Sequence, residues 1–372
     1  MYASLIRWQI FQRLLELFNV LYMFISVYGV LFMLQKLSPL LGAKLIQQTV
    51  RSQVLADNRA GVIPDRPLTI YMPEQSTPNQ LFPVLYLLAP WTSAGREQFA
   101  WSAFRESVFD QLTRLIAEKK IPPVIVVCPD LYTAFGGSQY INSPYLGLHG
   151  DFIVSELVPY IEANFPVKKG PEYRGVFGRS SGGFGAVRLA MDYPGVFSAV
   201  ACHSGDLGFD TSMRGDLLSL CKTLSKYKND VEVYLDYCRN APKLGGHDVH
   251  TLMLLGLAAS YSPNLHTQDG FDLPIDLYTG LIDEDIWGKW LSHDPVHRIK
   301  THAEGLKSLN ALYVECGRRD QFNLLYGARQ FKAALDGLNI SLHYEEFDDN
   351  HSGTSYRYAT SLPIITKHMW AN

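Results

Sequence analysis

One short segment of the chain has the residue types and the spacing of a nucleophile elbow. An apolar run leads into a G-x-S-x-G pentapeptide at 178–182, and a helix-compatible stretch follows. A serine in the middle of this pattern lies on a sharp turn between a buried strand and a helix, where backbone crowding favours glycine two positions away on each side. Gly178 and Gly182 meet this need for Ser180, but Ser181 lacks one of its two glycines. We therefore predict that Ser180 is a nucleophile. A phosphate-binding loop is disfavoured because the chain has no P-loop Lys-Ser/Thr pair and no G-x-G-x-x-G here.

A serine hydroxyl is a weak nucleophile at neutral pH and needs a base that a third group orients. On a fold with this kind of elbow, the acid and then the histidine follow the serine in chain order. Asp320 lies on the loop that follows an apolar run at 311–316, and His351 lies on the loop that follows the next run at 341–347. We expect Ser180 Oγ to face one nitrogen of the His351 imidazole and the Asp320 carboxylate to face the other.

Backbone N–H groups must stabilise the charge that develops on the substrate oxygen. The residue after the nucleophile, Ser181, supplies one of them. The loop at 89–95 follows an apolar run and should supply the second. Pro90 has no N–H group, so Trp91 is the expected donor and Thr92 the alternative.

Three further residues are candidates for the substrate pocket because of their positions. Arg179, next to the nucleophile, would favour acidic or phosphate-bearing substrates, unless a neighbouring carboxylate holds it. Tyr140 and Asn142 lie on an aromatic, glycine-rich loop and could line the same pocket.

No metal site or cofactor is expected. His247 with His250, and His293 with His297, have helical spacing, but neither pair has a third ligand nearby. His203 ends a predicted strand, and we interpret it as structural. The five cysteines show no C-x-x-C spacing. Three of them end apolar runs, and we expect these to be buried free thiols. Cys221 and Cys238 could form a disulfide or be free.

The elements that must position these groups alternate along the chain as short apolar runs and longer helix-like segments. This order predicts an α/β fold whose mainly parallel sheet is covered by helices on both faces, with an antiparallel edge at its first strands. The expected strands lie at 68–72, 83–88, 124–128, 173–177, 197–202, 311–316 and 341–347. The expected helices lie at about 98–119, 151–164, 182–193, 324–338 and 355–370.

The regular alternation fails between about 206 and 309. This stretch holds short helix-like pieces and an acidic, aromatic run, and it begins just after a strand end, where insertions that cover a ligand occur in open α/β sheets. We predict a cap over the active site within a catalytic domain at 48–372. A surface elaboration without substrate contact is the alternative.

Residues 1–47 form a separate apolar, helix-like segment. Its part at 17–34 contains no charged residue and, as a helix, would be roughly 27 Å long, enough to cross the hydrocarbon core of a bilayer. A membrane anchor, a helix packed on the catalytic body and a cleaved signal peptide all remain open, and membrane association is slightly favoured over a cytoplasmic location. The net charge of −3 and the absence of a basic cluster give no indication of a nucleic-acid partner.

Taken together, these motifs resemble the esterase branch of the α/β-hydrolases, which includes enterochelin esterases, S-formylglutathione hydrolase, feruloyl esterases and mycolyltransferases. Four segments carry the resemblance, which spans about 50–370: residues 82–88, 135–143, 178–183, and 316–320 together with 350–351. The family commonly has His-Gly where this chain has Ala89-Pro90.

The resemblance implies an α/β-hydrolase fold and a serine carboxylic-ester hydrolase that acts on a small-molecule ester through an acyl-enzyme. An acyltransferase with an alcohol or sugar acceptor would use the same residues. A non-catalytic binding protein on a hydrolase fold is the third hypothesis. A missing member of the triad would indicate it, and none is missing from this sequence.

Overall fold

The computed structural model describes residues 42–370 of the chain. The described residues from Lys44 onward belong to one compact unit, which is described here. The apolar segment at 17–34, and with it the predicted membrane anchor, lies outside the described residues. Within residues 42–370, no helix combines the length and the apolar character that crossing a bilayer requires.

An eight-stranded sheet with the order β1-β2-β4-β3-β7-β8-β9-β10 forms the centre of this unit. Its strands are β1 (Lys44–Arg51), β2 (Asp65–Met72), β3 (Val84–Leu88), β4 (Ile125–Pro129), β7 (Arg174–Arg179), β8 (Ala199–His203), β9 (Ala311–Gly317) and β10 (His343–Phe347). β2 pairs antiparallel with both β1 and β4, and every later neighbour pairs parallel, as predicted. All seven predicted strands are present with slightly shifted ends. β1 was not predicted, because polar and apolar residues mix on this exposed edge strand.

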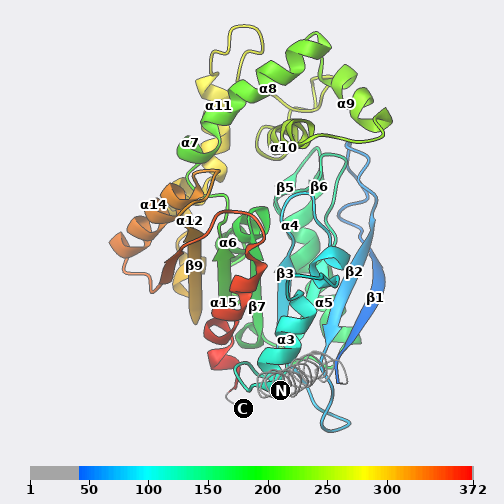
Figure 1. Ribbon diagram of the computed structural model, residues 1–372, viewed down its shortest axis with the longest axis vertical. Helices are drawn as coiled ribbons and strands as arrows, with labels where there is room; N and C mark the ends of the chain where they lie inside the picture. The colour runs from blue at the N-terminus through cyan, green and yellow to red at the C-terminus, as the bar shows by residue number, and fades with distance from the viewer. Residues whose placement is uncertain (1–41, 371–372) are drawn as a thin grey trace, which may run out of the picture. The chain divides into compact units, whose positions relative to one another are not determined.

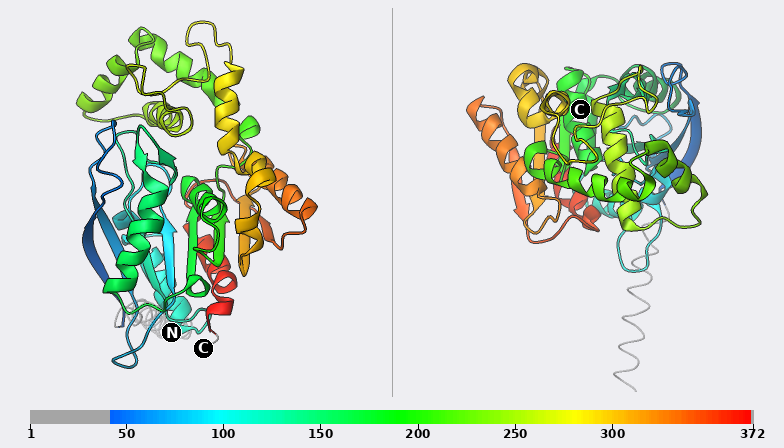
Figure 2. Two further views of the ribbon diagram at one scale, coloured as in Figure 1. Left: turned by 180° about the vertical axis from the view of Figure 1, so that it is seen from behind. Right: turned by 90° about the horizontal axis from the view of Figure 1, so that it is seen from above.

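Helices cover both faces of the sheet, as Figures 1 and 2 show. α3 and α15 lie on one face, and α5 and α6 lie on the other, where α12 packs between α6 and α14. The helices are α2 (Gly95–Phe99), α3 (Val108–Ala117), α4 (His149–Asp151), α5 (Val158–Asn164), α6 (Ser181–Asp192), α7 (Phe209–Ser212), α8 (Leu217–Leu224), α9 (Val231–Asn240), α10 (Gly246–Tyr261), α11 (Glu284–His293), α12 (Pro295–His302), α13 (Glu304–Lys307), α14 (Leu324–Gly337) and α15 (Tyr358–Ile365). A π-helical turn, Phe152–Leu157, joins α4 to α5, and a two-stranded hairpin, β5 (Asn142–Ser143) with β6 (Gly147–Leu148), stands apart from the main sheet.

The predicted helix at 98–119 is wrong in its middle. α2 ends at Phe99, and α3 begins only after Ser107. Ser107 Oγ accepts the Asp110 N–H, and the Asp110 carboxylate accepts the Ser107 N–H, so the two residues form a capping box that starts a new helix.

The helices α7 to α11 lie beyond the carboxyl edge of the parallel strands, above the sheet in Figure 1. They have their own apolar core, which includes Tyr234, Tyr261, Trp287 and Trp290 and which also contacts Trp91 of the β3 loop. α12 and α13, which we had included in the predicted cap, instead pack on α6, and their Ile299 and Leu306 join the core around the sheet. The helical layer over the edge therefore ends with α11.

All five cysteines are free thiols, and Cys128, Cys202 and Cys316 are buried, as expected for residues that end apolar strands. Cys221 and Cys238, whose pairing the sequence left open, are not bridged.

Candidate active site

Ser180 occupies a strained turn between β7 and α6. Its backbone has φ 57° and ψ −126°, a left-handed conformation that costs free energy in a residue with a side chain. The two flanking glycines are required here: a Cβ at Gly178 would lie 2.5 Å from the Leu88 carbonyl oxygen, and one at Gly182 would lie 2.0 Å from it. The G-x-S-x-G sequence therefore folds into this turn because only glycine fits against the end of β3.

His351 and Asp320 lie on the loops after two adjacent parallel strands, β10 and β9. His351 Nδ1 is 2.8 Å from Asp320 Oδ2, and both side chains are largely buried. The other carboxylate oxygen of Asp320 accepts the Phe322 N–H at 2.9 Å, and the Phe322 ring packs edge-on against the imidazole at 5.0 Å. The ring orientation of His351 is thus fixed from two sides, and Nε2 is the nitrogen left for other contacts.

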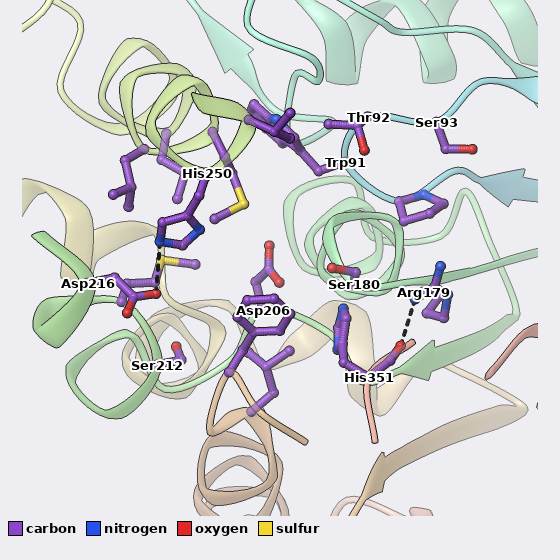
Figure 3. A pocket seen from close by; sticks show the side chains of 18 of the residues that line it. Trp91, Thr92, Ser93, Arg179, Ser180, Asp206, Ser212, Asp216, His250 and His351 are labelled. Carbon is purple, nitrogen blue, oxygen red and sulfur yellow. Dashed lines mark hydrogen bonds and ion pairs between the residues drawn. The ribbon is translucent and has the colours of Figure 1, made fainter. Parts of the chain in front are cut away.

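Ser180 and His351 line one cavity of about 720 Å³ at the carboxyl edge of the sheet. In Figure 3 the imidazole lies beside the serine hydroxyl. Asp320 does not line the cavity and supports His351 from behind. Among the hydrogen bonds of residues 42–370, none joins Ser180 Oγ to the imidazole. Such contacts are often longer before substrate binds.

The expected oxyanion donors lie at this same edge. Ser181 is the first residue of α6, where backbone N–H groups have no partner within the helix. Thr92 is not a free donor, because its N–H already binds the Gly136 carbonyl oxygen at 2.8 Å. Trp91 lines the cavity, and its indole Nε1 donates to the Phe135 carbonyl oxygen at 2.9 Å, which anchors the loop.

Arg179 does not extend freely into the cavity. Its Nη1 donates a hydrogen bond at 2.9 Å to the backbone carbonyl oxygen of His351, as the dashed line in Figure 3 marks. The sequence suggested two partners for Arg179, a substrate anion or a neighbouring carboxylate. The structure shows a third partner, the backbone of the loop that carries His351.

Tyr140 and Asn142 do not line this cavity. Tyr140 is buried, and its hydroxyl donates to the Ala89 carbonyl oxygen at 2.6 Å. The amide of Asn142 binds the Tyr193 hydroxyl and the Asp151 N–H on the β5 side of the structure. Their positions in the sequence suggested a role in the pocket, but the loop that carries them turns both side chains toward structural partners.

The remaining histidines form no metal site: within residues 42–370, no group of three or more His, Cys, Asp or Glu side chains could hold a metal ion. His203 is buried between Glu315, at 2.7 Å, and Ser361, at 2.8 Å, in agreement with a structural role. His250 of α10 lines the cavity and lies 3.4 Å from the Asp216 carboxylate.

The sequence pattern did not single out Asp206, a carboxylate close to the proposed catalytic residues. Asp206 follows β8, and its carboxylate points into the cavity that Ser180 and His351 line (Figure 3). Gln139 Nε2 donates to Asp206 Oδ2 at 2.9 Å. Burial raises the pKa of Asp206, opposed by the Gln139 hydrogen bond and by His351. Its position after a parallel strand was a usable signal, the same one that identified Asp320, but we had assigned residue 206 to the cap.

Comparisons with known proteins bear on the family and the fold of the chain. The chain is 34% identical over 134 residues to Esterase Rv1288 of Mycobacterium tuberculosis, which covers 35% of this chain and 26% of that protein. It is 28% identical over 167 residues to the uncharacterized protein YbbA of Bacillus subtilis, covering 42% of this chain and 62% of the relative. The matches thus span only about a quarter of the mycobacterial protein and under two thirds of the other.

Solved structures share the fold at low sequence identity. A ferulic acid esterase superposes with a TM-score of 0.56 at 20% identity, covering 88% of this chain and 99% of that one. An S-formylglutathione hydrolase from Staphylococcus aureus superposes with a TM-score of 0.52 at 17% identity, covering 88% and 98%. The fold is therefore the α/β-hydrolase fold. The sequence model of the family described as "Putative esterase" matches residues 64–363, most of the chain, and the protein belongs to that family.

Proposed function

We propose that this protein is a serine carboxylic-ester hydrolase that works through an acyl-enzyme on Ser180. The Ser180 oxygen attacks the ester carbonyl carbon while His351 Nε2 takes the hydroxyl proton. The tetrahedral intermediate collapses, the bond to the alcohol oxygen breaks, and His351 returns the proton to the leaving alcohol. Water, deprotonated by the same imidazole, then attacks the acyl-enzyme and releases the acid.

The observation that carries this proposal is the 2.8 Å contact between His351 Nδ1 and Asp320, with Nε2 and Ser180 facing one cavity. A carboxylate on Nδ1 keeps the proton on that nitrogen, so Nε2 is unprotonated and able to act as a base. It also stabilises the imidazolium that forms after proton transfer.

The charge on the carbonyl oxygen needs fixed donors, because water is largely displaced once the substrate fills the cavity. The N–H groups of Ser181 and Trp91 fill this role in our proposal. Within the described residues, neither takes part in another backbone hydrogen bond, whereas the Thr92 N–H does.

The test compares Ser180→Ala with Ser181→Ala. Ser180→Ala is expected to abolish both the hydrolysis of p-nitrophenyl butyrate and labelling by a fluorophosphonate. Ser181→Ala removes the adjacent hydroxyl but keeps the backbone N–H, so it should retain labelling and most of the activity. Persistent labelling of the Ser180→Ala protein would refute the assignment of the nucleophile.

A further inference from the structure

The charged side chains that line the cavity differ in the hydrogen-bond and ion-pair partners that they have within the protein. Its one guanidinium, Arg179, is turned toward the His351 carbonyl oxygen. Of the three carboxylates, Glu97 accepts a hydrogen bond from the Ser93 hydroxyl at 2.7 Å, and Asp216 lies 3.4 Å from His250. Asp206 has no cationic side chain within ion-pair distance among residues 42–370, and only one of its oxygens accepts a hydrogen bond, from Gln139.

The position of Asp206 relative to the nucleophile is fixed by close backbone packing. Gly205, immediately before it, lies against the first turn of α6: a Cβ on Gly205 would be 2.4 Å from Cys202 Sγ and 3.0 Å from the Phe184 nitrogen. Any side chain at position 205 would therefore push Asp206 away from Ser180. The carboxylate is held by the same helix start that holds the nucleophile.

Gln139, which donates a hydrogen bond to Asp206, has a strained backbone conformation. Gln139 and Tyr140 have φ of 54° and 59°, and Thr92, Ser180 and Ser204 also have positive φ. The other non-glycine residues with positive φ in the described chain are lysines and asparagines, and asparagine tolerates this conformation best. Strained residues persist where the surrounding structure imposes them, and such residues cluster at functional sites. Of the five residues named above, Thr92 and Ser180 line the cavity, and Gln139 donates its amide N–H to Asp206 from just outside it.

The second carboxylate oxygen of Asp206 has no hydrogen bond from the protein and depends on what occupies the cavity. The cavity that Asp206 lines also has an apolar part of its wall, which consists of Trp91, Met213, Met253, Leu254, Leu257 and Phe322. A carboxylate among apolar groups is stabilised by a charge-assisted hydrogen bond more strongly than it would be in water. A substrate that fills the cavity and displaces its water would have to supply a donor to this oxygen or leave it unpaired.

We propose that Asp206 determines the specificity of the enzyme by accepting a hydrogen bond from a donor group on the ester substrate, either a hydroxyl or an ammonium group. The inference rests on the proposed function, since it concerns the substrate of the same site. It also disfavours the acidic or phosphate-bearing substrate that Arg179 suggested, because such a substrate would face the Asp206 carboxylate, while Arg179 Nη1 is bonded to the His351 carbonyl oxygen.

Matched esters test the proposal. Ethyl heptanoate, ethyl 6-hydroxyhexanoate and ethyl 6-aminohexanoate differ only in their terminal group, a methyl, a hydroxyl or an ammonium. Butyl butyrate and 3-hydroxypropyl butyrate give the same comparison on the alcohol side. In at least one set, the ester whose chain ends in a hydroxyl or ammonium group is expected to have a kcat/KM roughly ten- to a hundredfold above that of the ester whose chain ends in a methyl group.

Two variants identify the residue and the donor. Asp206→Asn keeps the shape and can still accept a hydrogen bond, so it should remove a preference for ammonium but only weaken one for hydroxyl. Asp206→Leu should remove both. Asp216→Asn, which alters a carboxylate of the same cavity that is paired with His250, should leave the preference unchanged.

The outcomes separate this inference from the proposed function. If fluorophosphonate still labels Ser180 and the wild-type enzyme shows no preference for a donor in either set, Asp206 is not a specificity residue and the proposal is overturned, whereas the proposed function stands. The same follows if Asp206→Asn keeps an ammonium preference in full. If the wild-type enzyme is neither labelled nor active on any of the esters, it is the proposed function that fails.

Discussion

The guanidinium of Arg179 donates a hydrogen bond to the backbone carbonyl oxygen of His351 at 2.9 Å, across 172 positions of the sequence. Arg179 directly precedes Ser180, the proposed nucleophile, so this bond ties the elbow to the loop that carries His351, the proposed base. The His351 N–H is held in addition by Gln321 Oε1 at 3.0 Å. The backbone of His351 is thus held on both sides of its Cα, by Arg179 at the elbow and by Gln321 on the loop that carries Asp320.

Replacing Arg179 by alanine should therefore lower kcat and leave KM nearly unchanged. Without the hydrogen bond the imidazole can shift relative to Ser180, and a displacement of about 1 Å is enough to lower the rate by roughly a hundredfold. Steady-state kinetics on p-nitrophenyl butyrate give the two parameters separately. Arg318→Ala, which removes an exposed arginine near the same loops, serves as the control. A large rise in KM for Arg179→Ala with kcat intact would instead indicate direct contact between Arg179 and substrate.

A second prediction concerns the close packing of the turn at Ser180. Gly182→Ala would place a Cβ 2.0 Å from the Leu88 carbonyl oxygen, a contact that the turn cannot relieve without moving Ser180. We expect a loss of fluorophosphonate labelling together with a lower melting temperature. Gly288→Ala is the matched control: Gly288 lies within α11 with no heavy atom within 4 Å of the added methyl group, so this change should stabilise the protein by about 0.5–1 kcal/mol. A Gly182→Ala protein that is labelled like the wild type would contradict this account of the elbow.

The sequence predicted the parts of the site that depend on strand ends. Asp320 and His351 each lie on the loop after an apolar run, and parallel strands bring their carboxyl ends to one edge. Together with the chain order of serine, acid and histidine, this position predicted that the two side chains meet. The helix start at Ser107 was also readable, since Ser107 and Asp110 have the spacing of a capping box.

Other parts of the site could not be predicted because they depend on how loops turn in three dimensions. Tyr140 and Asn142 lie on a loop whose course is set by two consecutive residues with positive φ, Gln139 and Tyr140, and neither is a glycine that would have signalled the turn. The target of Arg179 is a backbone carbonyl, which leaves no mark in the sequence.

A third prediction concerns the pair of His351 and Asp320. Asp320→Asn keeps the size of the side chain but can present an N–H to Nδ1, which favours the tautomer with its proton on Nε2. In that tautomer Nε2 cannot accept the Ser180 proton, and kcat should fall by about four orders of magnitude. Asp348→Asn, an exposed carboxylate on the loop after β10, should change kcat little. Equal activity of Asp320→Asn and wild type would show that this carboxylate does not orient the base.

The last prediction concerns stability and pH at Asp206. Burial raises the pKa of its carboxyl group, so between the unfolded and the folded pKa the folded state binds more protons than the unfolded state. The free energy of unfolding must then decrease as the pH rises through the folded pKa, because the buried group becomes charged. Asp206→Asn carries no such charge and should melt at a higher temperature than the wild type at pH 7.5. The difference should disappear below about pH 4, where the carboxyl is protonated in both states.

Thermal unfolding of both proteins between about pH 3 and pH 8, followed by circular dichroism, measures this difference. Asp216→Asn is the control, since its carboxylate lies beside His250 and its removal should give no gain at pH 7.5. A stability gain at Asp206 that coincides with a loss of substrate discrimination would mean that the free energy spent on burying this carboxylate serves substrate recognition. If Asp206→Asn melts below the wild type at pH 7.5, the carboxylate is well satisfied where it lies and has no need of a donor from the substrate.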